Sequence, residues 1–248
     1  MLTNWRPNKT NKMSDIQKLL IGDVQTFSIV DFPCHIAAVA FLQGCPWRCP
    51  FCYNKSLQTL KQEEEPTWTF EKFLFFLERR KGVLNGVVFS GGEPLMQKGL
   101  FEAVKSVKSL GYHVGLHTGG YRPDALKTVL THLDWVGFDL KAPKAKYKAI
   151  TGGFDAFEDV KKSLHILAQS DVHFECRTTC DPRFLSLDDL FELGEFLKSM
   201  GVKEYYLQKY RPPESDKATT DANAEALVSS EKLNRFLKSS FEIFDVRR

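Results

Sequence analysis

The fold of this chain is decided by the stretch "HIAAVAFLQGCPWRCPFCYN", residues 35–54. Its first eight residues form an apolar run of the length and composition of a buried β-strand. Cys45, Cys49 and Cys52 follow at once, so three of the six cysteines of the chain lie within eight residues. In α/β barrels the reactive groups sit at the carboxyl ends of the strands. The stretch therefore predicts a barrel strand with a site at its end.

The same alternation of short apolar runs and longer amphipathic runs continues along the 248 residues. We expect strands at 35–42, 86–90, 113–118, 135–141, 173–179 and 204–210. We expect helices at 69–80, 97–110, 123–132, 156–168, 187–200 and near 224–240. Strands that alternate with helices predict βα units around a parallel sheet. The predicted fold class is α/β, a partial (β/α)6 TIM-like barrel.

No change of composition marks a domain boundary. We expect a flexible N-terminal tail over 1–17, one barrel domain over 18–248 and a solvated loop at 211–223. The composition, 43% hydrophobic and 26% charged, is globular, and a net charge of +3 is too weak to indicate a nucleic-acid partner. No apolar run reaches the roughly 18 residues of a membrane helix, and the polar start is unlike a signal peptide. We therefore expect a cytoplasmic protein whose cysteines stay reduced.

Reduced, clustered cysteines indicate a metal site before a disulfide. A structural zinc site is usually closed by four ligands, but the next Cys or His after Cys52 is His113. Cys34 and His35 lie at the other end of the strand, roughly 25 Å away. A [4Fe–4S] cluster normally takes four cysteines, and three would leave one iron open for a ligand. A zinc-stabilised binding module remains the alternative of another class.

Other strand ends carry polar residues. "VVFSGGEP" (87–94) ends in two glycines that allow close backbone approach, before Glu93 and Pro94. Asp139 and Lys141 are two residues apart and so share one face of their strand. Arg177 offers a guanidinium fork that matches a carboxylate. Cys176 faces away from Arg177, and we expect Cys176 and Cys180 to be packed residues rather than ligands.

Taken together, these motifs resemble the signature of the radical S-adenosylmethionine (radical SAM) enzymes from about residue 20 to the end. The resemblance implies a [4Fe–4S] cluster held by Cys45, Cys49 and Cys52. It implies that SAM is bound by Phe51 near the adenine and by Gly91, Gly92 and Glu93 at the amino group. Thr118, in "GLHTGGYRP" (115–123), stands where activating members carry a hydrogen-bonding residue, although the acid of their motif is missing.

The remaining SAM contacts follow from the same resemblance. It implies that Asp139 and Lys141 contact the ribose and the carboxylate of SAM. It implies that Arg177 holds that carboxylate and that Gln208 lies beside the adenine. The chemistry implied is reductive cleavage of SAM to methionine and a 5′-deoxyadenosyl radical that abstracts hydrogen.

A narrower resemblance concerns the substrate. "SIVDFPC" (28–34) is similar to the S-x-x-D-x-P-G stretch of glycyl-radical activating enzymes, with Cys34 in place of the glycine. "FECRTT" and "YLQKYRP" resemble the anaerobic ribonucleoside-triphosphate reductase activating protein. The function implied is an oxidoreductase of anaerobic metabolism that makes a glycyl radical on such a reductase, with flavodoxin or ferredoxin as electron donor. The alternative is a radical SAM enzyme acting on a small molecule, of the 7-carboxy-7-deazaguanine synthase type.

Overall fold

A computed structural model describes residues 19–59, 67–212 and 220–248. The predicted tail at 1–17 and the central part of the predicted loop at 211–223 lie outside these ranges. The described segments contain no helix that combines the length and apolar character needed to span a bilayer.

One sheet of eight strands organises the chain, and its strand order follows the sequence from β1 to β8. The strands are β1(Ile21–Ser28), β2(Ala37–Leu42), β3(Gly86–Gly91), β4(His113–Thr118), β5(Trp135–Asp139), β6(His173–Cys180), β7(Glu204–Lys209) and β8(Ile243–Arg247). β1 runs antiparallel to β2, and every later neighbour is parallel. Strands β2 to β7 are the six strands predicted from the sequence, so the parallel α/β architecture is confirmed.

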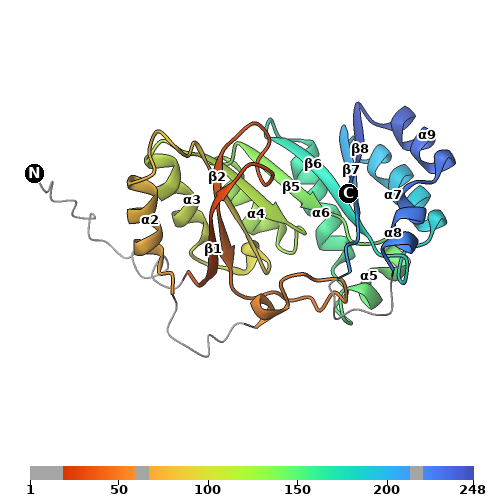
Figure 1. Ribbon diagram of the computed structural model, residues 1–248, viewed down its shortest axis with the longest axis horizontal. Helices are drawn as coiled ribbons and strands as arrows, with labels where there is room; N and C mark the ends of the chain where they lie inside the picture. Colours follow the sequence, from red (N-terminus) through yellow and green to blue (C-terminus); the bar gives the residue numbers. More distant parts are fainter. Residues whose placement is uncertain (1–18, 60–66, 213–219) are drawn as a thin grey trace, which may run out of the picture.

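Helices connect successive strands (Figure 1). They are α2(Phe70–Glu78), α3(Leu100–Ser109), α4(Pro123–Leu130), α5(Lys144–Ile150), α6(Phe157–Ala168), α7(Leu187–Ser199), α8(Asp221–Val228) and α9(Glu231–Ser240), with short 3-10 helices η1(Lys55–Gln58) and η2(Pro94–Met96). The prediction of a single helix near 224–240 is wrong, because the helix is interrupted between α8 and α9. Ser230 caps α9 there by accepting a hydrogen bond from the Leu233 amide.

The strands β2 to β7 could be found in the sequence because both of their faces are covered. In β2, five of the six residues are buried, which makes a continuous apolar run. The edge strands β1 and β8 were not predicted. β1 has only three buried residues of eight, at positions without the period of two that signals a strand, and β8 has none.

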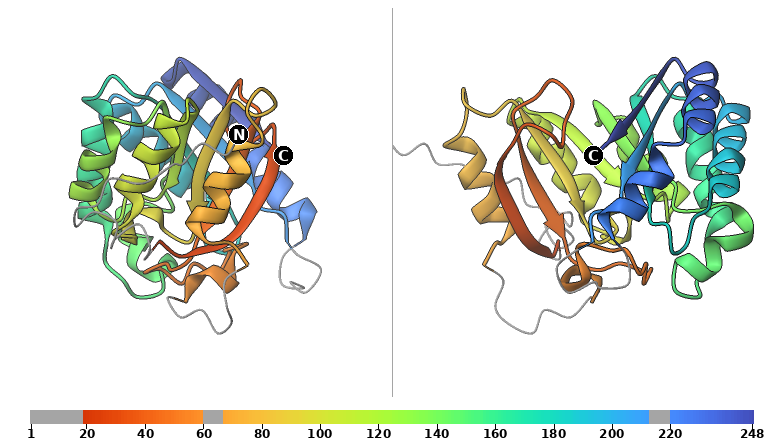
Figure 2. Two further views of the ribbon diagram at one scale, coloured as in Figure 1. Left: turned by 90° about the vertical axis from the view of Figure 1, so that its left-hand side faces the viewer. Right: turned by 45° about the vertical axis from the view of Figure 1, so that its right-hand side comes forward.

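The sheet curves into an open barrel with the helices on its convex side, and β1 and β8 form its two free edges (Figure 2). The concave side holds a small apolar cluster made by Phe32, Ala37, Val39, Val88 and Trp135. Phe32 comes from the β1–β2 loop, which folds inward between the strands. The rest of the concave side is polar at the carboxyl ends of the strands, where the candidate site lies.

Candidate functional site

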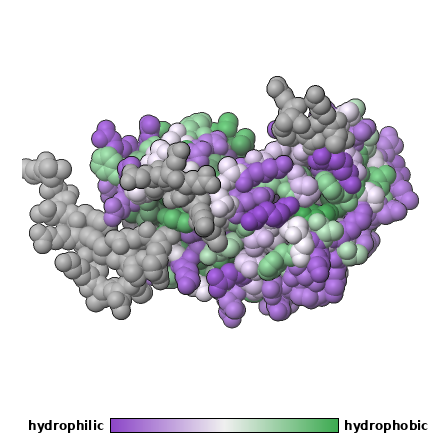
Figure 3. Space-filling model, turned by 90° about the horizontal axis from the view of Figure 1, so that it is seen from below, coloured by the Kyte–Doolittle hydropathy of each residue, from purple (hydrophilic) through white to green (hydrophobic). Residues whose placement is uncertain are grey.

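A single cavity collects the side chains that the sequence analysis singled out at the strand ends. Its wall combines the loop after β2 with the carboxyl ends of β3, β4, β5 and β6. The predicted site residues that line it are Cys45, Cys49, Phe51, Cys52, Gly91, Gly92, Glu93, Thr118, Asp139, Lys141 and Arg177. Trp47, Tyr53, Asn54, Gln58, Ser90, His117, Gly119 and Thr179 complete the wall. The cysteine loop and α5 lie on the lower side of Figure 1, and Figure 3 looks onto that face.

The cysteine loop, residues 43–59, is held in place by its own backbone. The Gly44 amide donates to the Leu57 carbonyl at 2.7 Å, and the Cys45 amide donates to the Gln58 carbonyl at 3.2 Å. The buried Gln43 side chain donates to the carbonyls of Ser56 and Thr59 at 3.0 and 2.8 Å. These hydrogen bonds join the two ends of the loop and fix its conformation, so the cysteines are held facing the cavity.

The thiols are suited to metal binding but not to ionisation on their own. Cys49 is buried, and Cys45 and Cys52 are half-buried. Burial raises the pKa of Cys45 to about 12 and also raises the pKa of Cys49. A metal ligand must be the thiolate, so binding of a metal group here must release protons from these thiols.

The donor set fits a group larger than one ion. In the described ranges, no three His, Cys, Asp or Glu side chains are placed to hold a single metal ion. Yet three thiols from one loop face the same cavity. A polynuclear cluster spreads its ligands over several ångströms and prefers sulfur, which fits this arrangement.

The two glycines of "SGGEP" bring β3 against the cysteine loop. The Gly92 amide donates to the Leu42 carbonyl and the Glu93 amide donates to the Gly44 carbonyl, both at 2.8 Å. A Cβ atom on Gly92 would lie 2.1 Å from the Gly44 oxygen. Only glycine allows this approach, which joins the end of β3 to the start of the cysteine loop.

Glu93 is a buried carboxylate that accepts three hydrogen bonds. Its Oε1 accepts from the Leu95 amide at 3.1 Å and from the Thr118 hydroxyl at 2.6 Å. Its Oε2 accepts from the Gly119 amide at 2.9 Å. Burial raises the pKa of Glu93, although these hydrogen bonds oppose the shift. Each carboxylate oxygen has two lone-pair positions, so Oε2 retains one for a ligand.

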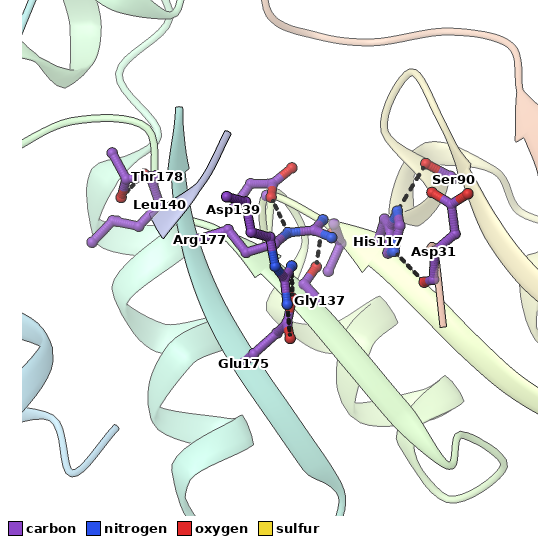
Figure 4. A network of polar contacts seen from close by, with 12 residues as sticks. Asp31, Ser90, His117, Gly137, Asp139, Leu140, Glu175, Arg177 and Thr178 are labelled. Carbon is purple, nitrogen blue, oxygen red and sulfur yellow. Dashed lines mark hydrogen bonds and ion pairs between the residues drawn. The ribbon is translucent and has the colours of Figure 1, made fainter. Parts of the chain in front are cut away.

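Asp139 and Arg177 form an ion pair between neighbouring strands, and Figure 4 shows them pointing toward each other. Arg177 Nε donates to Asp139 Oδ1 at 2.8 Å, and these two residues are register partners in β5 and β6. Burial raises the pKa of Asp139, but the charges of Arg177 and Lys141 and the hydrogen bond from Arg177 together hold that pKa below its usual value. Arg177 Nη1 has no hydrogen bond to another residue of the described ranges, so one edge of the guanidinium is available to an anion.

Lys141 brings a second positive charge to the cavity. Its Nζ lies 5.2 Å from the centre of the Trp47 ring, within cation–π range. Burial lowers the pKa of Lys141, but the acidic groups around it, with Cys49 and Asp139 the strongest, together raise that pKa above its usual value. The ammonium group therefore stays charged beside the cysteines.

His117 and Ser90 also line the cavity, and the sequence analysis assigned no role to either. In the structure His117 Nε2 lies 2.9 Å from the Asp31 carbonyl, which can only accept, so Nε2 carries the proton. Nδ1 then accepts from the Ser90 hydroxyl at 3.4 Å. Burial, with help from the Arg177 charge, lowers the pKa of His117 to about 3. Figure 4 shows the ring between the β1–β2 loop and β3.

The remaining candidates lie elsewhere. Gln208 is a half-buried residue of β7 and is not among the described residues that line the cavity. Cys176 and Cys180 are fully buried in the main apolar core, on the side of β6 opposite to Arg177. Cys34 is exposed, and His35 lies two residues before β2, so both are at the opposite end of β2 from the cysteine loop.

Comparison with known proteins supports this picture. Residues 39–180 match the Radical SAM superfamily. A protein of Methanocaldococcus jannaschii described as a glycyl-radical enzyme activating enzyme is 28% identical over 80% of this chain and 82% of its own length. The pyruvate formate-lyase-activating enzyme of Clostridium pasteurianum is 30% identical over 90% of this chain and 98% of its own.

Among solved structures, QueE from Escherichia coli superposes with a TM-score of 0.55 at 15% identity. The superposition covers 96% of this chain and 99% of that one. At this identity the likeness concerns the fold alone, and it extends over the whole open barrel.

Proposed function

This chain belongs to the radical SAM superfamily, whose members use a [4Fe–4S] cluster and SAM, and from that premise we propose that it activates a glycyl-radical enzyme. The observation that carries the proposal is the near full-length similarity to a pyruvate formate-lyase-activating enzyme, over 90% of one chain and 98% of the other. A second relative described as a glycyl-radical enzyme activating enzyme supports the same class.

In this proposal Cys45, Cys49 and Cys52, which line the cavity, would hold the cluster. When bound, the cluster and SAM supply a one-electron reductive cleavage of SAM and thereby a radical that removes a hydrogen atom. The chain supplies the enclosure for that step. The cysteine loop, β3 and the inner face of β4 to β6 wall the cavity on these sides, which limits the access of water to the reacting atoms.

The charged groups of the cavity complement the two charges of an amino acid. Glu93 Oε2 and the Thr118 hydroxyl are placed to receive the amino group of SAM, with Gly91 and Gly92 shaping the backbone beside it. Arg177, oriented by Asp139, presents its free guanidinium edge to the carboxylate, and Lys141 adds a second cation.

Phe51 and Gln208 are proposed neighbours of the adenine and Asp139 of the ribose. Phe51 lines the cavity and directly precedes Cys52 in the chain. Gln208 reaches this role only if the adenine extends beyond the cavity toward β7. This assignment is therefore the one that a SAM complex would test most sharply.

The substrate proposed is an anaerobic ribonucleoside-triphosphate reductase. The proposal rests on the stretches "FECRTT" at β6 and "YLQKYRP" at the end of β7, which resemble the activating protein of that reductase. The electron donor proposed is a flavodoxin or a ferredoxin.

A radical assay tests the function. The reconstituted protein is incubated without oxygen with SAM, a reductant and an anaerobic ribonucleotide reductase, and electron paramagnetic resonance is recorded. A glycine-centred doublet on the reductase is the expected result. SAM cleavage to 5′-deoxyadenosine without that doublet, for every glycyl-radical enzyme offered, would favour a small-molecule substrate such as that of 7-carboxy-7-deazaguanine synthase. A colourless, zinc-containing protein would favour the binding module.

A further inference from the structure

We propose that the outer face of the cysteine loop, together with α5, is the docking surface for an acidic one-electron carrier protein. We call this surface the basic rim and define it by Arg48, Tyr53, Lys55, Lys148 and Arg211. The inference rests on the proposed function, because only a bound cluster that must be reduced needs such a partner.

The basic rim contains exposed residues that adjoin the cysteines in the chain. Tyr53 directly follows Cys52 in the chain and is 59% exposed. Its ring stacks on Tyr210, with the ring centres 5.8 Å apart, and its hydroxyl accepts from the Arg211 amide at 2.8 Å. An exposed aromatic ring therefore stands one peptide bond from a proposed ligand, held rigidly between the cysteine loop and the end of β7.

The other side of the rim is formed by α5. The Arg48 amide, in the cysteine loop, donates to the Thr151 carbonyl at the end of α5 at 3.0 Å. A Cβ atom on Gly152 would lie 2.6 Å from the Arg48 Cβ, so the two segments are in direct contact. Arg48 also donates from Nη1 to the carbonyls of Cys45 and Trp47, both at 2.8 Å. Its positive charge thus lies over the outer side of the cysteine loop.

Among the described residues of this face, several cations have no acidic partner. Lys144 and Lys146 of α5 have acidic partners, Glu158 and Asp189, each at 2.6 Å. Lys55, Lys148 and Arg211 are exposed and make no ion pair with any other residue of the described ranges. Figure 3 shows hydrophilic side chains gathered across the centre of this face.

A positive rim around a redox centre selects a negatively charged partner. Complementary charge steers such a partner and fixes its orientation, mostly through the association rate. In the docked pair the carrier is oxidised by one electron and the bound cluster is reduced by one, and no atom or proton is exchanged. The contact need only be transient, since the oxidised carrier must leave.

Binding is measured first, without turnover. The cluster-loaded protein is titrated with an oxidised acidic flavodoxin at low ionic strength, and the Kd is determined by isothermal titration calorimetry. Lys148→Glu and Arg211→Glu should each weaken binding by about tenfold, since each replaces an attraction with a repulsion. Lys105→Glu is the matched control, because Lys105 is an exposed lysine of α3, outside the rim. Equal Kd values for wild type, control and rim variants would overturn the proposal.

Reduction is measured second, with two reductants. With dithionite the rim variants should cleave SAM at the wild-type rate, because dithionite needs no docking surface. With flavodoxin as reductant, the KM of the rim variants for the carrier should rise by about tenfold, as the Kd does. Added salt should reduce the difference in KM between the rim variants and the wild type. Absence of SAM cleavage in the wild type with dithionite would reject the proposed function instead. A rim variant with normal flavodoxin kinetics but a lower glycyl-radical yield would show that the rim binds the substrate protein and overturn the inference.

Discussion

The six cysteines of the chain differ in their surroundings, and the differences assign their roles at the scale of single residues. Cys45, Cys49 and Cys52 line the cavity on a loop closed by backbone hydrogen bonds. Cys176 and Cys180 are sealed in the apolar core, where burial raises both of their pKa values. Cys34 is exposed at the opposite end of β2, so only the first three can meet a metal group in the cavity without rearrangement of the fold.

Cys45→Ala, Cys49→Ala and Cys52→Ala should each abolish cluster assembly, because no fourth thiol faces the cavity among the described residues. Cys176→Ala and Cys180→Ala should keep the cluster and lose only about 1 kcal/mol of stability for the vacated volume. Iron and sulfide analysis after anaerobic reconstitution measures the first effect and urea unfolding the second. Loss of iron in either core variant would contradict the ligand assignment.

His117 predicts a pH dependence of stability. The pKa of His117 is about 3 in the folded protein, against about 6.5 in the unfolded chain. Between these values the unfolded chain binds a proton that the folded protein does not, so stability falls as the pH drops. Because the ring borders an open cavity, we expect a loss of only about 1 kcal/mol between pH 7 and pH 5.

The comparison variant is His117→Gln, whose amide can still donate to the Asp31 carbonyl. Its free energy of unfolding, measured in urea at both pH values, should fall by about 1 kcal/mol less than that of the wild type. The same pH dependence in both proteins would show that His117 is not the group responsible.

At the scale of elements, the junction between β3 and the cysteine loop depends on backbone contact. Gly91 has φ = 115°, and a Cβ atom there would lie 2.2 Å from the Leu42 amide nitrogen. Gly111 has a similar φ of 91°, but a Cβ atom would meet nothing within 4 Å. Substitutions at these two glycines therefore separate the free-energy cost of a left-handed backbone from the free-energy cost of a steric clash.

Gly111→Ala should cost about 1 kcal/mol, the strain of a positive φ for a residue with a Cβ atom. Gly91→Ala should cost about 3 kcal/mol or more, because β3 must also move away from β2. Urea unfolding of the metal-free proteins measures both. Equal costs would mean that the close approach at Gly91 relaxes without penalty.

The β1–β2 loop contains the only left-handed residue other than glycine in the described ranges, Cys34, with φ = 61°. This is the position at which the resembling motif has glycine. Cys34→Gly should therefore raise the free energy of unfolding by about 0.5 kcal/mol, since the released strain exceeds the added freedom of the unfolded chain. Cys34→Ala, which keeps the strain, should show no gain in the same urea experiment. A glycine variant less stable than the alanine variant would contradict this.

At the scale of the whole molecule, an ion pair reinforces the pairing of the last strand, β8, with β7. Arg247 of β8 donates from Nη2 to Glu175 Oε2 at 2.8 Å and lies 3.8 Å above the Tyr206 ring. Glu175 is only 1% exposed, and it lies in β6, two strands away. The ion pair therefore spans β7 and stabilises the free edge of the open barrel. Figure 4 shows Glu175 close to the Asp139–Arg177 pair.

Arg247→Ala should destabilise the protein by about 2 kcal/mol, because it leaves the buried Glu175 carboxylate without its partner. The estimate is below the usual range for buried pairs because the Arg247 side chain is 37% exposed. The double variant Arg247→Ala/Glu175→Gln should recover part of the loss, measured by urea unfolding. A double variant as unstable as the sum of both single variants would show that the two residues act independently.

The sequence by itself determined the six inner strands, most of the helices and the cysteine triplet, because these are local patterns. A run of apolar residues or a spacing of cysteines is complete within a few residues. Only the tertiary structure decided that Asp139 pairs with Arg177, that His117 joins Ser90 to the β1–β2 loop, and that β1 and β8 flank the barrel. Those contacts depend on strand register and on how a loop folds into the barrel, and they join residues 27 to 86 positions apart. Edge strands and side-chain partners leave no local period in the sequence, because the physical cause of each lies in a distant part of the chain.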